Sequence, residues 1–295
     1  MNWWQTSREL SIATRMARPT DRPALAALLA GSWRRHGMAA ADEQLALLSS
    51  GVSPVAWQGD RLLAFLGISP RAEVAEAAEH WADVALIALA LGVPASRTLR
   101  ALLETALPAL YARGVTGLVC LTDKGWLRSA LAEIGFREAD QVLTYVFTGR
   151  QPPASGLVAE LRPATPAWAE AVLALNAAAF PPLWRYAPAT TLSWLLTADH
   201  AVVAWVDGQP AGFALTTANG QAGYAYLIRV ATHPQFQRRG IGRQMVADAI
   251  LYGQRAGASG LMLNTQASNT VSRHLYEAMG FHISGPLTAV MIYRL

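Results

Sequence analysis

Two closely spaced glycines, Gly240 and Gly242, follow a pair of arginines in the second half of the chain. The order of residue types over residues 230–250 predicts a strand, a turn, a glycine-rich loop and then a helix. Such a loop turns several backbone N–H groups toward one anion, and the helix N-terminus adds the positive end of its dipole. Glycine lets the main chain approach a phosphate because no Cβ stands in the way. The stretch therefore predicts a phosphate-binding loop, with an ordinary solvated basic turn as the alternative.

The spacing of these glycines differs from that of two common nucleotide-binding loops. A P-loop needs Gly-Lys-Ser or Gly-Lys-Thr, and the chain contains neither sequence. A Rossmann fingerprint needs a third glycine at the position where this chain has Met245. The chemistry of these two nucleotide-binding folds is therefore not expected here.

A second pattern, downstream of the loop, combines a helix cap with a phenol. Asn269 predicts an N-cap, and Tyr276 lies on the predicted helix, which a glycine ends. Residues 237–242 resemble the Q/R-x-x-G-x-G/A motif of the GNAT superfamily of N-acetyltransferases, which binds the pyrophosphate of acetyl-CoA. Residues 269–281 resemble the N-x-x-A-x-x-L/F-Y-x-x-x-G-F pattern that closes the cofactor site of that superfamily. The two motifs in this order make the resemblance highly specific.

The resemblance implies a role for each part of the two patterns. Backbone groups at the strand end would bind the pantetheine arm, and one amide would face the thioester oxygen. Asn269 would cap its helix and touch CoA, and Tyr276 would act as general acid toward the departing sulfur. A tyrosine merely packed on its helix face is the alternative. The other residues expected to bind the cofactor are Val230, Ala231, Thr232, Arg238, Arg239, Gly240, Ile241, Gly242 and Arg243.

The residue that would deprotonate the acceptor amine is less clearly marked. In the ribosomal-protein alanine acetyltransferases a glutamate lies five residues before the asparagine of the second motif, and here Asn264 fills that position. An amide cannot accept a proton from an ammonium group, so the chain departs from that subfamily. The base would be another residue or a water chain, or none would be needed for an amine of low pKa. His233 is interpreted as a solvated turn histidine.

The acceptor side of the site is expected in an aromatic, proline-rich segment that follows the first helix of the second half. Trp184 and Tyr186 could form an aromatic wall, and Arg185 could bind a carboxylate or phosphate. Tyr224 and Tyr226 alternate on one predicted strand and could line the same cleft. The alternatives are a rigid loop whose aromatic side chains anchor it to the core, and plain core or surface packing for the two strand tyrosines.

Composition limits the class of protein. The chain has 295 residues, 53% of them hydrophobic and 15% charged, with a net charge of +4, so two globular domains are expected. The mild positive charge suits an anionic ligand. The sequence lacks the stripe of basic residues interleaved with aromatic ones that is typical of nucleic-acid binding, so no nucleic-acid partner is expected. Cys120 is the single cysteine, so neither a disulfide nor a cysteine-based metal site is expected. Residues 1–17 lack a signal-type apolar core, and the apolar run 84–93 is too short for a membrane span, so a cytoplasmic protein without membrane contact is expected.

The two halves of the chain echo each other, which predicts tandem domains rather than a solenoid. Similar helix starts, Gly/Asp hairpin turns and Gly-Phe endings recur about half a chain apart, and a Pro/Gly/Ser-rich boundary falls near residue 150. The resemblance implies an α/β fold of two tandem GNAT-like domains, each a mixed, mainly antiparallel sheet flanked by helices. The layout is similar to that of mycothiol synthase, although no residue pattern singles out its substrate. The expected domains are residues 1–150 and residues 151–295.

The first half lacks the features that would bind the cofactor. When the two halves of the sequence are aligned, residues 97–101 correspond to the glycine loop but contain no glycine, and Leu131 stands in place of Tyr276. Residues 1–150 are therefore expected to be a degenerate domain without catalysis. Residues 151–295 are expected to transfer an acyl group, acetyl by preference, from acyl-CoA to the primary amine of a small molecule or peptide by direct attack in a ternary complex. The alternative is a non-catalytic acyl-CoA-binding or regulatory module.

Overall fold

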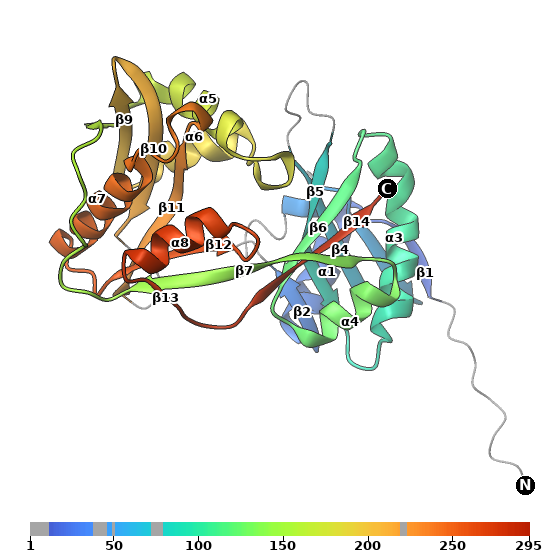
Figure 1. Cartoon of the computed structure of the whole chain (residues 1–295). Helices are drawn as coiled ribbons and strands as arrows, with labels where there is room; N and C mark the ends of the chain where they lie inside the picture. Colours follow the sequence, from blue (N-terminus) through green and yellow to red (C-terminus); the bar gives the residue numbers. More distant parts are fainter. Residues whose placement is uncertain (1–11, 38–45, 49–50, 72–78, 219–222) are drawn as a thin grey trace, which may run out of the picture. The chain divides into compact units, whose positions relative to one another are not determined.

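The computed structural model of the chain describes residues 12–37, 46–48, 51–71, 79–218 and 223–295. The described residues divide into two compact units. Unit 1 falls within Met1–Arg71, Ala77–Ala139 and Ala289–Leu295, and unit 2 comprises Asp140–Thr288. Each unit is a mixed sheet flanked by helices (Figure 1), which confirms the predicted fold class.

Unit 1 is built on a sheet whose strands follow the order β1-β3-β4-β5-β6-β14, with β2 paired to β5. The pairings are antiparallel except between β5 and β6. Leucine-rich helices cover the sheet because their buried positions recur at helical spacing. The elements are β1 (Ala13–Met16), α1 (Arg22–Gly31), β2 (Arg34–Gly37), β3 (Pro54–Gln58), β4 (Arg61–Pro70), β5 (Trp81–Leu89), α3 (Ala95–Tyr111), β6 (Gly117–Thr122), α4 (Gly125–Glu133) and β14 (Thr288–Arg294).

Unit 2 repeats this design with strand order β7-β12-β11-β10-β9-β8, and β13 pairs with β7. Its pairings are also antiparallel except between β11 and β12. Its elements are β7 (Arg137–Phe147), β8 (Glu160–Pro163), the 3-10 turn η2 (Pro166–Trp168), α5 (Ala169–Ala179), η3 (Pro182–Trp184), α6 (Pro188–Thr197), β9 (His200–Val206), β10 (Gln209–Thr217), β11 (Ala225–Thr232), η5 (Pro234–Phe236), α7 (Ile241–Arg255), β12 (Leu261–Gln266), α8 (Thr270–Ala278) and β13 (His282–Ile283).

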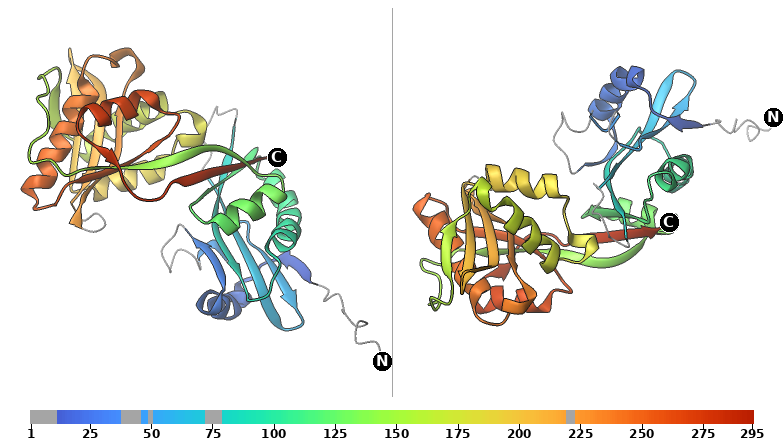
Figure 2. Two further views of the ribbon diagram at one scale, coloured as in Figure 1. Left: turned by 60° about the horizontal axis from the view of Figure 1, so that its bottom comes forward. Right: turned by 90° about the horizontal axis from the view of Figure 1, so that it is seen from above.

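The sheet of unit 2 carries helices on both faces (Figures 1 and 2). Along β9 and β10, Val203 and Phe213 pack against α5 and α6, whereas their neighbours Ala204 and Ala214 pack against α7 and α8. This division follows from the alternation of side chains along a strand. The apolar stripe of α7, which includes Met245, is buried against the sheet and holds the N-terminus of that helix at the end of β11.

Each unit takes one sheet strand from the part of the sequence that otherwise builds the other unit. From Asp140 onward β7 belongs to unit 2, where it pairs antiparallel with β12 from Val142↔Gln266 to Phe147↔Leu261. From Ala289 onward β14 belongs to unit 1, where it pairs with β6. The two units are therefore interleaved along the chain. The predicted division at residue 150 stays a prediction, although the last strand before it completes the sheet of unit 2.

Candidate active site

Two neighbouring parallel strands diverge in the middle of unit 2. β11 and β12 pair only from Ala225↔Leu261 to Leu227↔Leu263. Directly after this point β11 has a bulge, because its pairing with β10 skips Ile228. A bulge bends a strand and increases its twist. The remainder of β11 therefore leaves β12, and a cleft opens between them.

The backbone of β11 directs hydrogen-bonding groups into this opening. The amide of His233, the next residue after β11, donates to the Ala211 carbonyl at 2.8 Å, on the β10 side. Because successive amides in a strand point to opposite sides, the amides of Val230 and Thr232 point away from β10. Ala231 turns its own amide toward β10 and is among the residues that line the cleft. The strand end thus offers two donors to a ligand in the cleft.

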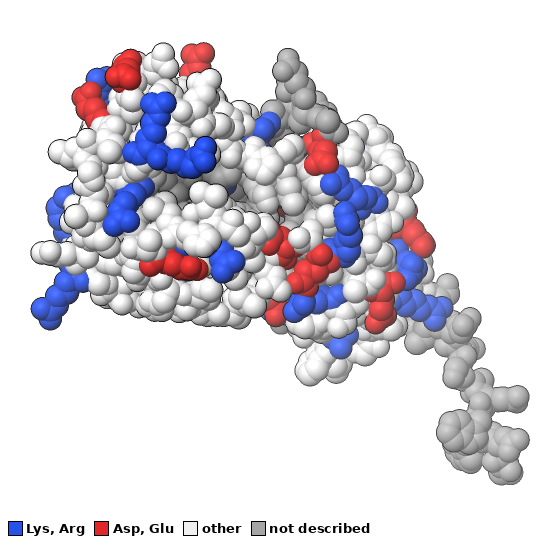
Figure 3. All heavy atoms as spheres, viewed as in Figure 1, with Lys and Arg blue, Asp and Glu red and all other residues white. Residues whose placement is uncertain are grey.

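The cleft has a volume of about 250 Å³ and gathers most of the residues predicted to bind the cofactor. Arg239 and Asn269 are the predicted residues that do not line it. In Figure 3, basic side chains border a hollow on the face of unit 2 seen there. The lining consists of Val230, Ala231, Thr232, Phe236, Gln237, Arg238, Gly240, Ile241, Gly242, Arg243, Val271, Ser272, Leu275 and Tyr276. The α8 residues beside Tyr276 were not predicted, although their helical spacing from it would have indicated them.

The loop between η5 and α7 has the geometry of an anion site. Gly240 is the N-cap of α7, with a φ of 86° that favours glycine, and no side chain caps the helix. The first amides of α7 consequently lack intrahelical partners and face outward. Arg238 also adopts the left-handed region, with a φ of 61°, which is rare for a residue with a side chain. Arg239 lies over the ring of Phe236 at 5.3 Å, outside the cleft lining.

The second glycine of the loop is needed for space rather than for backbone conformation. A Cβ added at Gly242 would lie 3.5 Å from Thr232 Oγ1 and 3.5 Å from Leu275 Cδ2. Both neighbours line the cleft. A longer side chain at this position would therefore fill the space between β11 and α8. The absence of a side chain at residue 242 therefore leaves this part of the cleft open.

Tyr276 is buried, with 4% of its surface exposed, yet it lines the cleft. Burial raises the pKa of Tyr276 to about 12, against a smaller lowering by a hydrogen bond with Ser272. Its ring packs between Tyr145 and Phe281, with centroid distances of 5.9 and 5.7 Å. The hydroxyl is therefore protonated at neutral pH and held in one place. This arrangement suits a hydrogen-bond or proton donor.

Tyr145, on β7, supports the helix that carries Tyr276. Its hydroxyl donates to Glu277 Oε1 at 2.6 Å and accepts from Arg273 Nε at 3.3 Å. Burial, followed by the bond to Glu277, raises the pKa of Tyr145. Sequence reasoning did not find this residue, because the contact joins positions more than a hundred residues apart and has no local signal.

Three polar residues considered at the sequence level have structural partners. Asn269 caps α8 as predicted, with Oδ1 accepting from the Ser272 amide at 3.2 Å. Asn264 Oδ1 accepts from Thr144 Oγ1 at 2.9 Å. His233 Nδ1 accepts from the Gln235 amide at 3.3 Å and caps η5, which agrees with a turn role. None of the three provides an evident base in the cleft.

The residues predicted for the acceptor side do not line the cleft. Arg185 donates to the carbonyls of Phe180 and Ala177, so its guanidinium is engaged by its own loop. Tyr186 packs edge-on against Trp194 at 4.7 Å. Tyr224 lies against the backbone at Gly260, before the start of β12. These contacts are those of the packing alternative.

Tyr226 and Trp184 lie in the α5–α6 part of unit 2. Burial raises the pKa of Tyr226 to about 12, and the nearby Tyr186 raises it further. The Trp184 carbonyl accepts a 2.7 Å hydrogen bond from Arg229, on the same strand as Tyr226. Of the residues predicted for the acceptor side, Tyr186 and the backbone of Trp184 contact Arg229, and Tyr226 lies near Tyr186.

Arg229 is a residue of the site that sequence reasoning missed. Its guanidinium donates to Asn176 Oδ1 at 3.2 and 3.0 Å. It also lies 3.4 Å from the ring centre of Phe180 and 4.8 Å from that of Tyr186. One arginine on β11 therefore holds both ends of the segment between α5 and α6 through hydrogen bonds and cation–π contacts.

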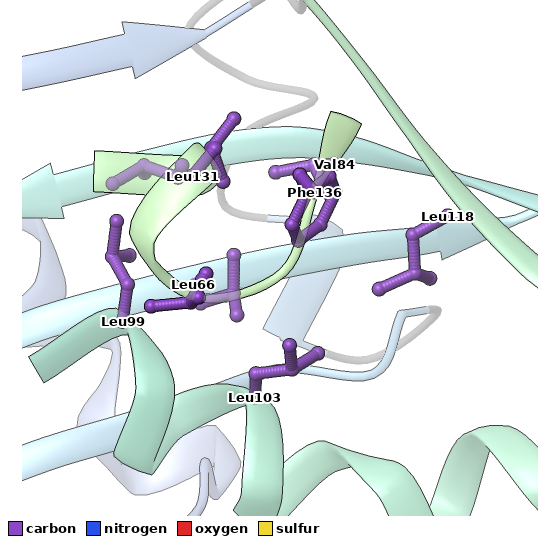
Figure 4. Close-up of a pocket in the computed structure, with 9 residues that line it drawn as sticks. Leu66, Val84, Leu99, Leu103, Leu118, Leu131 and Phe136 are labelled. Carbon is purple, nitrogen blue, oxygen red and sulfur yellow. The ribbon is translucent and has the colours of Figure 1, made fainter. Parts of the chain in front are cut away.

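The corresponding region of unit 1 is closed. Between α3, α4 and the strands β4 to β6 only about 10 Å³ is left, and its lining is entirely apolar. Figure 4 shows Leu99 and Leu131 pointing into this space from the two helices, with Leu66, Val84 and Leu118 from the strands. Leu131 is the seventh residue of α4, as Tyr276 is of α8. Side chains fill the place that is open in unit 2.

Within the described ranges, no group of three or more His, Cys, Asp or Glu residues could hold a metal ion. In the same ranges, no helix is long and apolar enough to cross a bilayer.

Comparison with known proteins identifies the fold around the cleft. Residues 169–281 match the acetyltransferase (GNAT) family. The chain carries a GNAT acetyltransferase domain. The matched residues include the loop at the start of α7 and the helix that bears Tyr276, so the predicted resemblance is confirmed.

Two curated relatives each match part of the chain. Aminoglycoside N(6')-acetyltransferase type 1 of Salmonella typhimurium is 29% identical over 96 residues, which are 30% of this chain and 66% of that protein. The ribosomal protein bS18 alanine N-acetyltransferase of Escherichia coli is 34% identical over 76 residues, 26% of this chain and 50% of that protein. The chain thus spans between half and 66% of the length of these relatives.

The likeness of fold extends over both units. A solved tandem GNAT protein from the clavulanic acid biosynthesis pathway covers 96% of this chain and 98% of its own, with a TM-score of 0.61 and 13% identity. At this identity the likeness concerns the fold alone. It agrees with two GNAT-like units in one chain.

Proposed function

We propose that the protein is an acyl-CoA-dependent N-acyltransferase that transfers acetyl from acetyl-CoA to a primary amine. The observation that carries the proposal is the cleft of unit 2, in which an anion-binding loop and a buried, protonated Tyr276 line the same space. The GNAT match over these residues and the likeness to two N-acetyltransferases support it.

The residues present fit acetyl-CoA at both ends of the cleft. The uncapped N-terminus of α7, with Arg238 and Arg243, would hold the pyrophosphate. The diverging strand end at Val230 and Thr232 would hold the pantetheine arm through backbone hydrogen bonds. The absence of a side chain at Gly242 leaves room for the arm between β11 and α8.

Acetyl-CoA supplies an activated acetyl group when it is bound. The chain's own groups would assist its transfer in two ways. An amide of β11 aimed into the cleft would stabilise the developing oxyanion, as a preorganised donor does. Tyr276 would donate a proton or hydrogen bond to the leaving sulfur, because its raised pKa keeps the hydroxyl protonated. The amine would attack directly while both substrates are bound.

The acceptor amine would approach from the α5–α6 side of the diverging strands. Arg229 fixes the segment between these helices, and Tyr186 and Tyr226 lie close together there. The relatives' names place amines of a sugar antibiotic and of a protein among their acceptors. We propose a small-molecule or peptide amine of this general class for the present chain.

Unit 1 would not catalyse the reaction. The place of the cofactor cleft is filled by leucines, and α3 has no glycine in its first turn. The catalytic sheet does need residues 140–147 of β7, which lie before the predicted boundary and belong to unit 2. We propose that unit 1 has a structural role and no catalytic one.

A non-catalytic acyl-CoA-binding module is the second candidate. The observation in its favour is Asn264, which occupies the position of a glutamate base in one GNAT subfamily and is bonded to Thr144 instead.

The two candidates are separated by thiol release. Acetyl-CoA is incubated with a panel of primary amines, and free CoA is followed with a thiol reagent. Turnover with at least one amine supports the enzyme. Tight binding of CoA without amine-dependent thiol release across a broad panel would leave the binding module as the better account.

A further inference from the structure

A second hollow lies in unit 1, beside the start of α3 and away from the closed region between α3 and α4. It has a volume of about 680 Å³, which falls within the range of small-molecule sites. The turn between β3 and β4 forms one side, and the β5–α3 connection forms another. Its lining consists of Ile12, Gln58, Arg61, Leu63, Leu91, Gly92, Val93, Pro94, Arg97, Thr98 and Ala101.

The polar end of this hollow is positively charged. Pro94 is the N-cap of the seventeen-residue helix α3, and no side chain caps the first turn. Its first amides therefore lack intrahelical partners. Arg61 and Arg97 line the same hollow. Among the described residues, neither guanidinium has a hydrogen-bond or ion-pair partner. No described residue therefore neutralises this charge.

Two buried polar atoms of the lining also lack partners. Thr98 is 1% exposed, and its Oγ1 has no hydrogen-bond partner in the described chain. Gln58 Nε2, on the facing strand, is buried and equally unpartnered. More than nine-tenths of buried polar groups in proteins are hydrogen-bonded, so these two atoms are groups of the lining that a ligand would satisfy.

Unit 2 shows how the same helix position is satisfied when chain fills the space. Gln244 is the fourth residue of α7, as Thr98 is of α3. The predicted alignment of residues 97–101 with the glycine loop is therefore wrong by five residues, and residues 92–96 lie at the start of α3 as that loop lies at the start of α7. Its side chain accepts from the amides of Val158 and Ala159 at 3.0 Å and donates to the Ala159 carbonyl at 2.8 Å. No described residue of unit 1 satisfies Thr98 in this way. Within the described residues, the two units therefore differ in what contacts this side of the helix.

We propose that the hollow of unit 1 binds an organic anion, a carboxylate or phosphate ester joined to an apolar body. The anionic head would be held by Arg61, Arg97 and the first amides of α3, with Gln58 and Thr98 as further hydrogen-bond partners. The apolar body would lie against Leu63 and the other aliphatic side chains of the lining. This site is separate from the acetyl-CoA cleft and does not depend on the proposed transferase activity.

Calorimetric titration of the full chain tests the proposal. The probes are octanoate and octyl phosphate, which present the two head groups on the same tail. Octan-1-ol and octylammonium serve as neutral and cationic probes with that tail. Titrations are made in the presence of CoA, so that the anion site of unit 2 is not available to the probes. We expect at least one of the two anions to bind at one site per chain and the other probes to bind at least ten-fold more weakly.

Variants locate the binding. The double change Arg61→Gln with Arg97→Gln should weaken anion binding by about ten-fold or more. Thr98→Val should weaken it by a smaller factor while the thermal midpoint of the free protein stays the same or rises, because an unpaired buried hydroxyl is removed. Arg113→Gln, just beyond the other end of α3, is the matched control and should change nothing. Absence of binding by both anions, equal binding of octan-1-ol, or unchanged affinity in the double variant would overturn the proposal.

Discussion

Replacement of Tyr276 by phenylalanine removes one hydroxyl from the cleft and keeps the ring. The ring contacts with Tyr145 and Phe281 remain, so the packing of α8 on β7 is preserved. The loss to stability is that of one neutral hydrogen bond with Ser272, about 1 kcal/mol. A change of this size lowers Tm by at most about 4 °C in a domain of this length. The variant should therefore be folded and able to bind CoA.

The effect on turnover should be much larger. A positioned proton donor contributes about 10²- to 10⁴-fold to a reaction, which corresponds to about 3–5 kcal/mol of activation free energy. We expect kcat for the best amine to fall by about 10²-fold or more. In the wild type, the pKa of Tyr276 is about 12. Ionisation of this residue should therefore reduce activity only above about pH 11.

Thiol release and calorimetric CoA binding are measured on the wild type, Tyr276→Phe and Tyr145→Phe. The last is the matched control, because its hydroxyl contacts Glu277 and Arg273 and does not line the cleft. Its turnover should stay within a few-fold of wild type. Equal turnover in Tyr276→Phe and wild type would refute the assignment of a proton donor. Loss of CoA binding in that variant would instead indicate a structural role.

Four other perturbations have defined outcomes. Gly240→Asp should abolish CoA binding in calorimetry, through backbone strain and charge, whereas Gly257→Asp at the other end of α7 (φ 81°) should retain it. Arg229→Gln should raise KM for the amine by about ten-fold and leave CoA affinity unchanged; equal losses of both would contradict an acceptor-side role. Burial lowers the pKa of His36 from 6.5 to about 4, so the unfolded chain binds this proton first and acid weakens folding. Urea titrations should show about 3 kcal/mol lost between pH 6.5 and pH 4, and less in a His36→Gln variant. A fragment of residues 151–295 should fail to give a cooperative thermal transition, because it lacks β7; a folded, CoA-binding fragment would show that the strand is dispensable.

The parts of the site that could be predicted from sequence are local. The strand, loop and helix around Gly240 are continuous in the chain, so residue spacing indicated their geometry directly. Asn269 was predicted as a helix cap for the same reason, and the structure confirms the cap. The prediction that Tyr276 lines the cofactor cleft depended on the two motifs facing one cleft, and the GNAT resemblance implied that arrangement.

The parts that could not be predicted depend on contacts between distant residues. Thr144 and Asn264 are 120 positions apart, and nothing in either segment indicates that β7 pairs with β12. The clamp of Arg229 on Trp184 likewise depends on how α5 and α6 cover the sheet. The sequence indicates that Arg185 lies in a loop, which led to the expectation that it is available for a substrate. The sequence does not indicate that the guanidinium donates to the Ala177 carbonyl. Each case involves tertiary contacts that hydrophobic periodicity does not encode.

Binding stoichiometry of acetyl-CoA tests the central claim most directly, because the account places one working cofactor site in a chain with two similar units. Calorimetric titration of the full chain should give one site per chain, and Gly240→Asp should remove it. Two sites per chain, or one site that survives the substitution, would contradict the assignment of the cofactor to the cleft of unit 2.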